Sequence, residues 1–273
     1  MNWHAKAAIA RSCAWLFIAF VLLYLMLPTI IIATASVSSQ ETLAFPPAGF
    51  SMQWYERAIS YPDFQSAFKN SLFISLGTST LATALGTAYA YVLERHNFPG
   101  KKLITAALLS PLVIPHFIIG LAVLIFAVQL GYVRSFETII LVHIMIVVPF
   151  VVRSVLVSLR MIDTDVERAA SSLGATPFTV FTHVTLPLLA PGIFGGWLFA
   201  SILSFTEFSG SLFVSTQSTQ PLPVAMFTYI RDFADPTMAA LSTIIIGVVA
   251  ILLVIGAKWF GLSSIISVHD DAH

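Results

Sequence analysis

Residues capable of catalysis are few in this sequence, and their spacing matches no catalytic arrangement. The seven histidines are scattered along the chain: His4, His96, His116, His143, His183, His269 and His273. No two of them have the H-E-x-x-H spacing of a zinc site, and no G-x-S-x-G nucleophile motif occurs. A Gly-rich phosphate loop is also missing, so this chain is not itself an ATPase. We therefore expect no catalytic residue, no metal site and no cofactor bound by this chain. An intramembrane enzyme is only a remote alternative.

Some ionisable residues and prolines instead lie in or beside strongly apolar segments. A carboxylate such as that of Glu207 is costly there unless it reaches the interface, pairs with another group or meets a ligand. Prolines free backbone carbonyls, which must then face protein or a wet cavity. The candidates for a solute pathway are Glu207, Thr206, Phe205, Pro115, His116 and His143. The alternatives are an interfacial acid, kinks that only shape packing, and a histidine bonded to a neighbouring helix.

The stretch Glu167–Pro187 is the longest run suited to water or to another protein. Asp163 just before it is a good helix N-cap, and Gly174 suits the end of a first short helix. Thr176-Pro177 predicts the start of a second helix, which Pro187 should end or kink. The first helix is nearly free of bulky side chains, so we expect an elbow of two short helices that fits as a small knob into a cleft.

The elements that must position these residues are membrane spans. The chain has 273 residues, of which 58% are hydrophobic and only 10% charged, and its formal charges balance. Apolar runs of about 20 residues recur, the length that crosses the hydrocarbon core. We expect an all-α polytopic membrane protein with six spans, at about 13–35, 70–92, 103–129, 137–156, 188–205 and 238–260. The single Cys13 excludes an internal disulfide, and no basic excess indicates nucleic acid.

The distribution of basic residues predicts the orientation of this single domain, residues 1–273. With both termini inside, nine basic residues lie at the cytoplasmic face: Lys6, Arg11, Arg95, Lys101, Lys102, Arg153, Arg160, Arg168 and Lys258. Four lie outside: Arg57, Lys69, Arg134 and Arg231. The excess of basic residues inside predicts a cytoplasmic loop at about 158–187 and external loops at about 37–67 and 209–236. Within the first external loop, residues 52–59 could form a short interfacial helix.

The cytoplasmic loop resembles the EAA loop of the permease subunits of bacterial ATP-binding-cassette (ABC) importers. That pattern is E-A-A, three residues, G, a spacer, then I/V-x-L-P. The residues that match it are Ala169, Ala170, Gly174, Val184, Leu186 and Pro187. Arg168 stands where the family has its glutamate, and Glu167 lies one position earlier. The acidic contact to the ATPase would therefore be shifted or replaced.

Three weaker matches resemble the polyamine-type branch of the same family. Residues 45–72 resemble its external loop, with F-P, G-F-S, W-Y and N-S-L in order. Residues 204–207 resemble its S-F-D-E, although Thr206 stands in place of the aspartate. Asp235-Pro236 and Ala239 match a further external loop of that branch.

The resemblance implies the fold of a type I ABC importer permease and a role in import without enzymatic activity. The residues that would dock on the ATPase are Glu167, Arg168, Ala169, Ala170, Leu173, Gly174, Ala175 and Pro187. The implied partners are a homologous permease or a second copy, two ATPase subunits that carry ATP and Mg, a periplasmic binding protein and lipid of the bacterial inner membrane. The solute would be a polyamine such as spermidine or putrescine. An opine, another amino-acid derivative or an aminoalkylphosphonate is the alternative, and a scaffold or sensor without transport is a remote one.

Overall fold

A computed structural model describes residues 3–42, 45–131 and 135–259, and every regular element in these ranges is helical. Arg134 and Phe260, used above for orientation and for the end of the last span, lie outside these ranges. The chain forms two compact units. One unit comprises Met1–Tyr61 and Tyr229–Ala250, and the other comprises Pro62–Thr228 and Ile251–His273.

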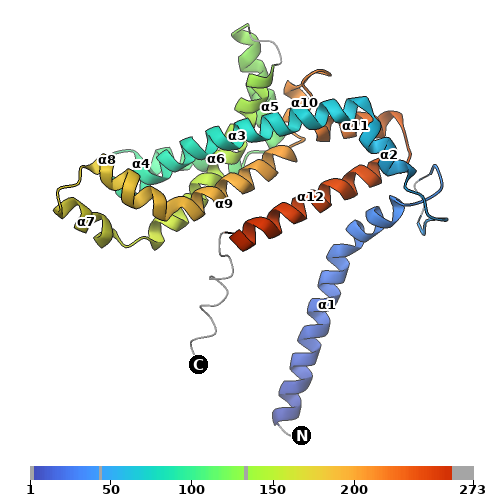
Figure 1. Cartoon of the computed structure of the whole chain (residues 1–273), viewed down its shortest axis with the longest axis horizontal. Helices are drawn as coiled ribbons and strands as arrows, with labels where there is room; N and C mark the ends of the chain where they lie inside the picture. The colour runs from blue at the N-terminus through green and yellow to red at the C-terminus, as the bar shows by residue number, and fades with distance from the viewer. Residues whose placement is uncertain (1–2, 43–44, 132–134, 260–273) are drawn as a thin grey trace. The chain divides into compact units, whose positions relative to one another are not determined.

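Three long helices form the centre of the larger unit and run side by side: α3 (Pro62–Arg95), α6 (Phe136–Met161) and α9 (Leu186–Phe205) (Figure 1). The core between them is dominated by β-branched side chains of α6, among which Val147, Val151 and Val155 are fully buried. Small residues on the partner helices allow this close approach. A Cβ at Gly86 of α3 would lie 2.7 Å from the Val151 side chain.

A hydrogen bond across the helices adds to this packing. Ser154 of α6 donates to the backbone carbonyl of Gly192 in α9 at 2.9 Å. Gly192 also has no room for a Cβ, because the Ser158 side chain fills that space. Small residues of α6 and α9 thus form contacts that hold these two helices at a fixed distance.

The third predicted span is broken into two helices. The segment consists of α4 (Lys101–Leu109), the 3₁₀ turn η1 (Ser110–Leu112) and α5 (His116–Gln129), with an angle of 106° between its two halves. Pro111 and Pro115 flank the break, and two missing N–H donors so close together explain why one continuous helix does not form. The second half, α5, packs on α6 and on the short helix α10 (Ser211–Val214).

Within the described residues, five helices are long and apolar enough to cross a membrane, and six if the broken pair counts as one span. Several helices extend beyond the predicted apolar runs, and some of the added residues, such as Phe64 of α3 and Leu159 of α6, are buried. The prediction of an all-α polytopic protein is confirmed.

The smaller unit contains α1 (Trp3–Ala35), α2 (Gln53–Ser60), the last residues of α11 (Leu222–Asp232) and most of α12 (Thr237–Trp259). The predicted short helix at 52–59 is therefore confirmed as α2. The indole N–H of Trp54 donates to the Ser38 carbonyl at 2.7 Å, and the Arg57 guanidinium lies 3.3 Å from the Asp235 carboxylate. The Tyr229 hydroxyl donates to that carboxylate at 2.9 Å, and burial raises the pKa of Tyr229.

Candidate functional site

The predicted elbow is two short helices, α7 (Thr164–Ser172) and α8 (Pro177–Val180). The Asp163 side chain caps α7 by accepting from the backbone N–H of Asp165 at 2.9 Å. Thr176 caps α8, and Pro177 occupies its first turn, as predicted.

Gly174 closes α7 in a backbone conformation that suits glycine. Its φ is +89°, in the left-handed region. Its N–H donates to the Ser171 carbonyl at 3.0 Å, and the N–H of Ala175 donates to the Ala170 carbonyl at 3.2 Å. These two bonds form a Schellman motif, so the predicted C-cap is confirmed and the direction of the turn between α7 and α8 is fixed.

The sequence predicted that Pro187 would end or kink the second helix, and the first of these alternatives is wrong, because the chain stays helical through Pro187. Between α8 and α9 lies a π-helical turn, η2 (Phe181–Thr185), and Pro187 falls in the first turn of α9. The wider turn accommodates a proline that has no N–H to donate. The elbow therefore continues directly into the long helix α9.

Glu167 does not point to solvent, although it was predicted as part of a docking surface. Its side chain is 15% exposed and lies against Arg95 at the end of α3, which is also 15% exposed. Arg95 Nη2 donates to Oε1 at 3.2 Å, and Arg95 Nε forms an ion-pair contact with Oε2 at 3.0 Å without hydrogen-bond geometry. The buried Thr185 hydroxyl of η2 donates to Oε1 at 2.8 Å. Arg95 also donates to the Leu159 carbonyl of α6 at 3.4 Å.

The exposed surface of the elbow carries two large apolar side chains, although the first helix was predicted to be nearly free of bulky ones. Leu173 is 90% exposed and Phe178 is 76% exposed, at the two sides of the turn. Arg168 is also exposed, and it lies 3.0 Å from the exposed Asp165 of its own helix. The remaining predicted docking residues divide by exposure: Ala169, Gly174 and Pro187 are exposed, whereas Ala170 and Ala175 are half-buried.

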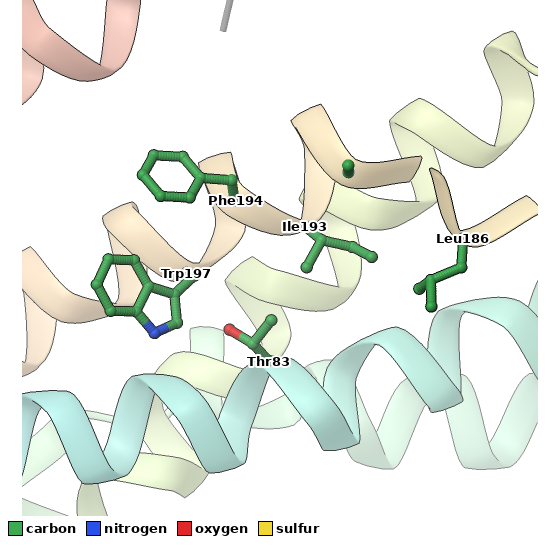
Figure 2. A pocket seen from close by; sticks show the side chains of 6 residues that line it. Thr83, Leu186, Ile193, Phe194 and Trp197 are labelled. Atoms are coloured by element: carbon green, nitrogen blue, oxygen red, sulfur yellow. The ribbon is translucent and has the colours of Figure 1, made fainter. Parts of the chain in front are cut away.

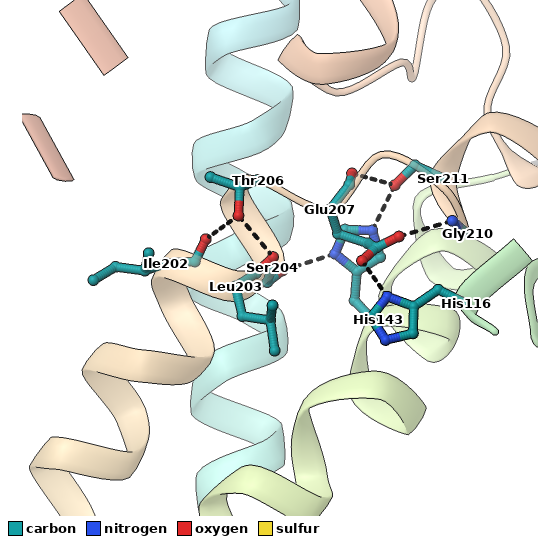
Figure 3. Close-up of polar contacts among 9 residues, drawn as sticks. All are labelled: His116, His143, Ile202, Leu203, Ser204, Thr206, Glu207, Gly210 and Ser211. Carbon is teal, nitrogen blue, oxygen red and sulfur yellow. Dashed lines mark hydrogen bonds and ion pairs between the residues drawn. The ribbon is translucent and has the colours of Figure 1, made fainter. Parts of the chain in front are cut away.

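A second cluster lies at the opposite end of α9, about 30 Å away for a helix of 20 residues. Glu207 follows α9 and is only 6% exposed. Its Oε2 lies 2.8 Å from Nδ1 of His116, at the start of α5, and its Oε1 accepts from the N–H of Gly210 at 2.8 Å (Figure 3). Glu207 is therefore a buried and paired acid. The sequence alone had not distinguished this arrangement from an acid exposed at the membrane interface.

His143 of α6 is fully buried beside this pair and bonds to two serines (Figure 3). Nδ1 lies 2.7 Å from Ser204 Oγ, and Nε2 lies 2.7 Å from Ser211 Oγ. The Ser211 hydroxyl donates to the backbone carbonyl of Glu207 at 3.1 Å, so its oxygen accepts from Nε2–H of His143. Nδ1 of the neutral ring then accepts from Ser204. This chain fixes the loop that carries Glu207 to α6.

The other pathway candidates lie at the edge of this cluster. The Thr206 hydroxyl donates back to the Ile202 carbonyl at 2.9 Å, and Thr206 is exposed. Phe205 is half-buried and packs edge-on against Phe68, with ring centroids 5.9 Å apart. Pro115 is exposed directly before His116. The structure thus joins His116, His143 and Glu207, and it leaves Thr206 and Pro115 on the surface.

A cavity of about 330 Å³ lies between α3 and α9 (Figure 2). The residues that line it are Thr83, Leu186, Ala190, Ile193, Phe194 and Trp197. None of these side chains is ionisable, so this cavity offers a cationic solute aromatic rings but no charge partner.

The sequence reasoning did not identify Arg95, Thr185, Ser204 and Ser211 as members of these clusters. Arg95 carried a visible signal, since a basic residue at the end of a long helix suits the helix dipole. Ser204 stood out only as the first residue of the S-F-D-E resemblance, and Ser211 and Thr185 carried no signal, because small hydroxyl residues are frequent throughout the spans. Phe178 was visible as an aromatic in a polar loop.

Comparison with known proteins agrees with this architecture. Residues 81–261 match the family described as binding-protein-dependent transport system inner membrane component. The chain is 34% identical over 236 residues to the putrescine transport system permease protein PotI of Escherichia coli K12, covering 84% of each chain. It is 29% identical over 235 residues to the spermidine/putrescine permease PotC of the same organism, covering 86% of this chain and 88% of PotC.

The fold also matches that of a solved importer. A chain of the bacterial ABC transporter that imports the acidic polysaccharide alginate superposes with a TM-score of 0.68 at 14% identity, covering 96% of this chain and 99% of that one. Family match, sequence identity and fold agree, and the chain therefore belongs to the binding-protein-dependent transport system inner membrane components, the permease subunits of ABC importers.

Proposed function

We propose that this permease carries a polyamine across the bacterial inner membrane. The observation that carries the proposal is the identity of 34% to PotI and 29% to PotC over more than four fifths of the chain. The alginate importer has the same fold but an acidic cargo, so the fold alone does not select the solute. A buried acid at one end of α9 favours a cation over an anion.

The proposed contact for one ammonium group is the His116–Glu207 pair. His116 is 33% exposed, whereas Glu207 is 6% exposed. A solute arriving at this cluster would therefore meet the imidazole first. An ammonium group could replace the imidazole N–H at Oε2, while the Gly210 N–H keeps Oε1 in place. His143 supports this exchange by holding the loop through Ser211.

The elbow is the proposed docking site for an ATPase subunit in the cytoplasm. Leu173 and Phe178 project from it, and exposed apolar side chains on a capped turn suit a cleft in a partner protein. With the elbow inside, the Glu207 cluster lies toward the outer side, because about 30 Å of α9 separates the two. Both termini then lie inside, and a periplasmic binding protein delivers the solute to the outer face.

The proposed assembly contains two permease subunits, two ATPase subunits and the binding protein. ATP and Mg would be bound by the ATPase subunits. The second permease is either another copy of this chain or a homologue, and the solute path would run between the two.

Purification of the tagged chain from its native membrane, followed by identification of the proteins that accompany it, tests the assembly. We expect an ATPase subunit and a second permease. The accompanying binding protein is then titrated calorimetrically with putrescine, spermidine, an opine and 2-aminoethylphosphonate. Tight binding of either polyamine supports the proposal. Tight binding of only another solute would refute the polyamine assignment without affecting the assignment to the importer family.

A further inference from the structure

Four elements of the larger unit meet at the carboxylate of Glu167. α7 supplies the carboxylate, and α3 supplies Arg95, which lies 3.0 Å from Oε2. η2, at the start of α9, supplies the Thr185 hydroxyl at 2.8 Å. α6 supplies the Leu159 carbonyl, which accepts from the same guanidinium at 3.4 Å. The elbow is thereby bonded directly to the end of α3 and to η2 just before α9, and it is linked to the end of α6 through Arg95.

Two neighbouring ion pairs differ from this arrangement in their exposure. Arg160 lies 3.3 Å from Glu94, with exposed fractions of 67% and 25%, and Arg168 lies 3.0 Å from Asp165, with 77% and 75%. Exposed pairs of this kind contribute little, because water and salt screen them. Glu167 and Arg95 are each 15% exposed and are bonded to further groups, so screening weakens this pair much less.

We propose that Arg95, Glu167 and Thr185 form a clamp that makes the elbow move as one body with the inner ends of α3, α6 and α9. The inference rests on the docking of the elbow proposed above and assigns Glu167 a different task from contact with the ATPase. Glu167 acts as a positioning residue: it holds α7 to the helix bundle, while Leu173 and Phe178 present the docking surface.

The clamp has a mechanical consequence for transport. α7 is joined to α6 by a short connection and to α9 by the capped turn, α8 and η2, and none of these connections ties it to α3. The shielded ion pair adds that tie and limits movement of α7 relative to α3. A displacement of the elbow by the ATPase then moves the inner end of α9 and, through α9, the loop that carries Glu207.

The test measures the distance between the elbow and α3 in the assembled importer. Spin labels are placed at the exposed positions Ser172 and Asn97 in a Cys13→Ser background, since Cys13 is the single native cysteine. Distances are recorded without nucleotide and after trapping with ATP and vanadate. The variants are Glu167→Gln, Arg95→Gln and the charge swap Arg95→Glu/Glu167→Arg. The matched control is Glu94→Gln, which removes an exposed pair one position away.

We expect one narrow distance in both states for the unsubstituted residues and for Glu94→Gln. In Glu167→Gln and Arg95→Gln, the fraction of trapped importers at that distance should fall about fivefold or more, as expected for loss of a coupling interaction, and the charge swap should recover part of it. An unchanged distance in both Gln variants, or a shift on trapping in the unsubstituted importer, would overturn the clamp. Loss of the ATPase from Glu167→Gln with the narrow distance retained would also overturn it, because Glu167 would then be a docking contact. Failure of the unsubstituted chain to retain any ATPase would overturn the proposed assembly itself, and the clamp would then have no motion to transmit.

Discussion

Substitutions of Gly174 by residues of different size distinguish two effects on ATPase binding, the strain of the backbone and the obstruction of the docking surface. The residue has a φ of +89°, and a Cβ built there meets no atom within 4 Å. Alanine therefore causes no clash, and its entire cost is that of a left-handed L-residue, about 1–2 kcal/mol. Asparagine tolerates this region better, so Gly174→Asn should cost less than Gly174→Ala.

A strain of this size shifts the elbow between its capped and its uncapped forms. An energy of 1–2 kcal/mol changes such a ratio by about 5- to 30-fold. The affinity for the ATPase should fall by at most that factor in Gly174→Ala, because it follows the capped fraction, and it should fall less in Gly174→Asn. Gly174→Trp should bind more weakly than Gly174→Ala, because it adds bulk beside Leu173 to the same strain.

Gly100 provides a matched control in another loop. Its φ is +84°, and a Cβ there also meets nothing within 4 Å. The series Gly100→Asn, Gly100→Ala and Gly100→Trp therefore imposes equal strain away from the elbow. The assay is the affinity of the purified permease for its ATPase in detergent, with thermal unfolding measured in parallel. Wild-type affinity of Gly174→Trp, or equal losses in the Gly100 series, would refute the reasoning.

Three further substitutions test the other end of α9 and its packing. Gly120→Ala should destabilise the protein by about 1–3 kcal/mol in detergent unfolding, because its Cβ would lie 2.5 Å from a backbone carbonyl oxygen, whereas Gly247→Ala meets nothing and should not. His143→Leu should lower the free energy of unfolding by about 1–3 kcal/mol, because the buried Ser204 hydroxyl loses its partner. The control His183→Leu changes an exposed residue and should have little effect. Equal unfolding temperatures of the two variants would contradict this reasoning. Glu207→Gln should raise the KM for putrescine uptake about tenfold, the equivalent of about 1.4 kcal/mol, and unchanged uptake would restrict Glu207 to a structural role.

Local features of this protein could be predicted from sequence because their causes are local. The cap of α7 needs a residue with positive φ at a particular place, and Gly174 meets that need within its own turn. Thr176 and Pro177 likewise define the start of α8 without help from the rest of the chain. The long apolar runs define the spans for the same reason.

Pairings between distant segments could not be predicted in this way. Arg95 and Glu167 are 72 positions apart and meet only because α3, α6 and the elbow have particular lengths and crossing points. The angle of 106° after α4 depends on what α5 packs against, while the prolines indicate only that the helix is interrupted. The burial of Glu207 depends on His116, which is 91 positions away and starts α5 as a result of that break.

The two acids singled out by the sequence, Glu167 and Glu207, have a common feature that bears on how this permease works. Each is shielded from solvent and bonded to a basic side chain of another helix, Arg95 in one case and His116 in the other. The pairs differ in what an incoming partner can replace. Arg95 also bonds to the α6 backbone, whereas the partly exposed imidazole of His116 has Glu207 as its one hydrogen-bond partner among residues 3–42, 45–131 and 135–259. Replacing the basic partner therefore costs less free energy at Glu207 than at Glu167, because fewer hydrogen bonds are lost. This difference suits the proposed roles of the two pairs. The Arg95–Glu167 pair would persist at the end that docks on the ATPase, and the His116–Glu207 pair would open at the end that receives the solute.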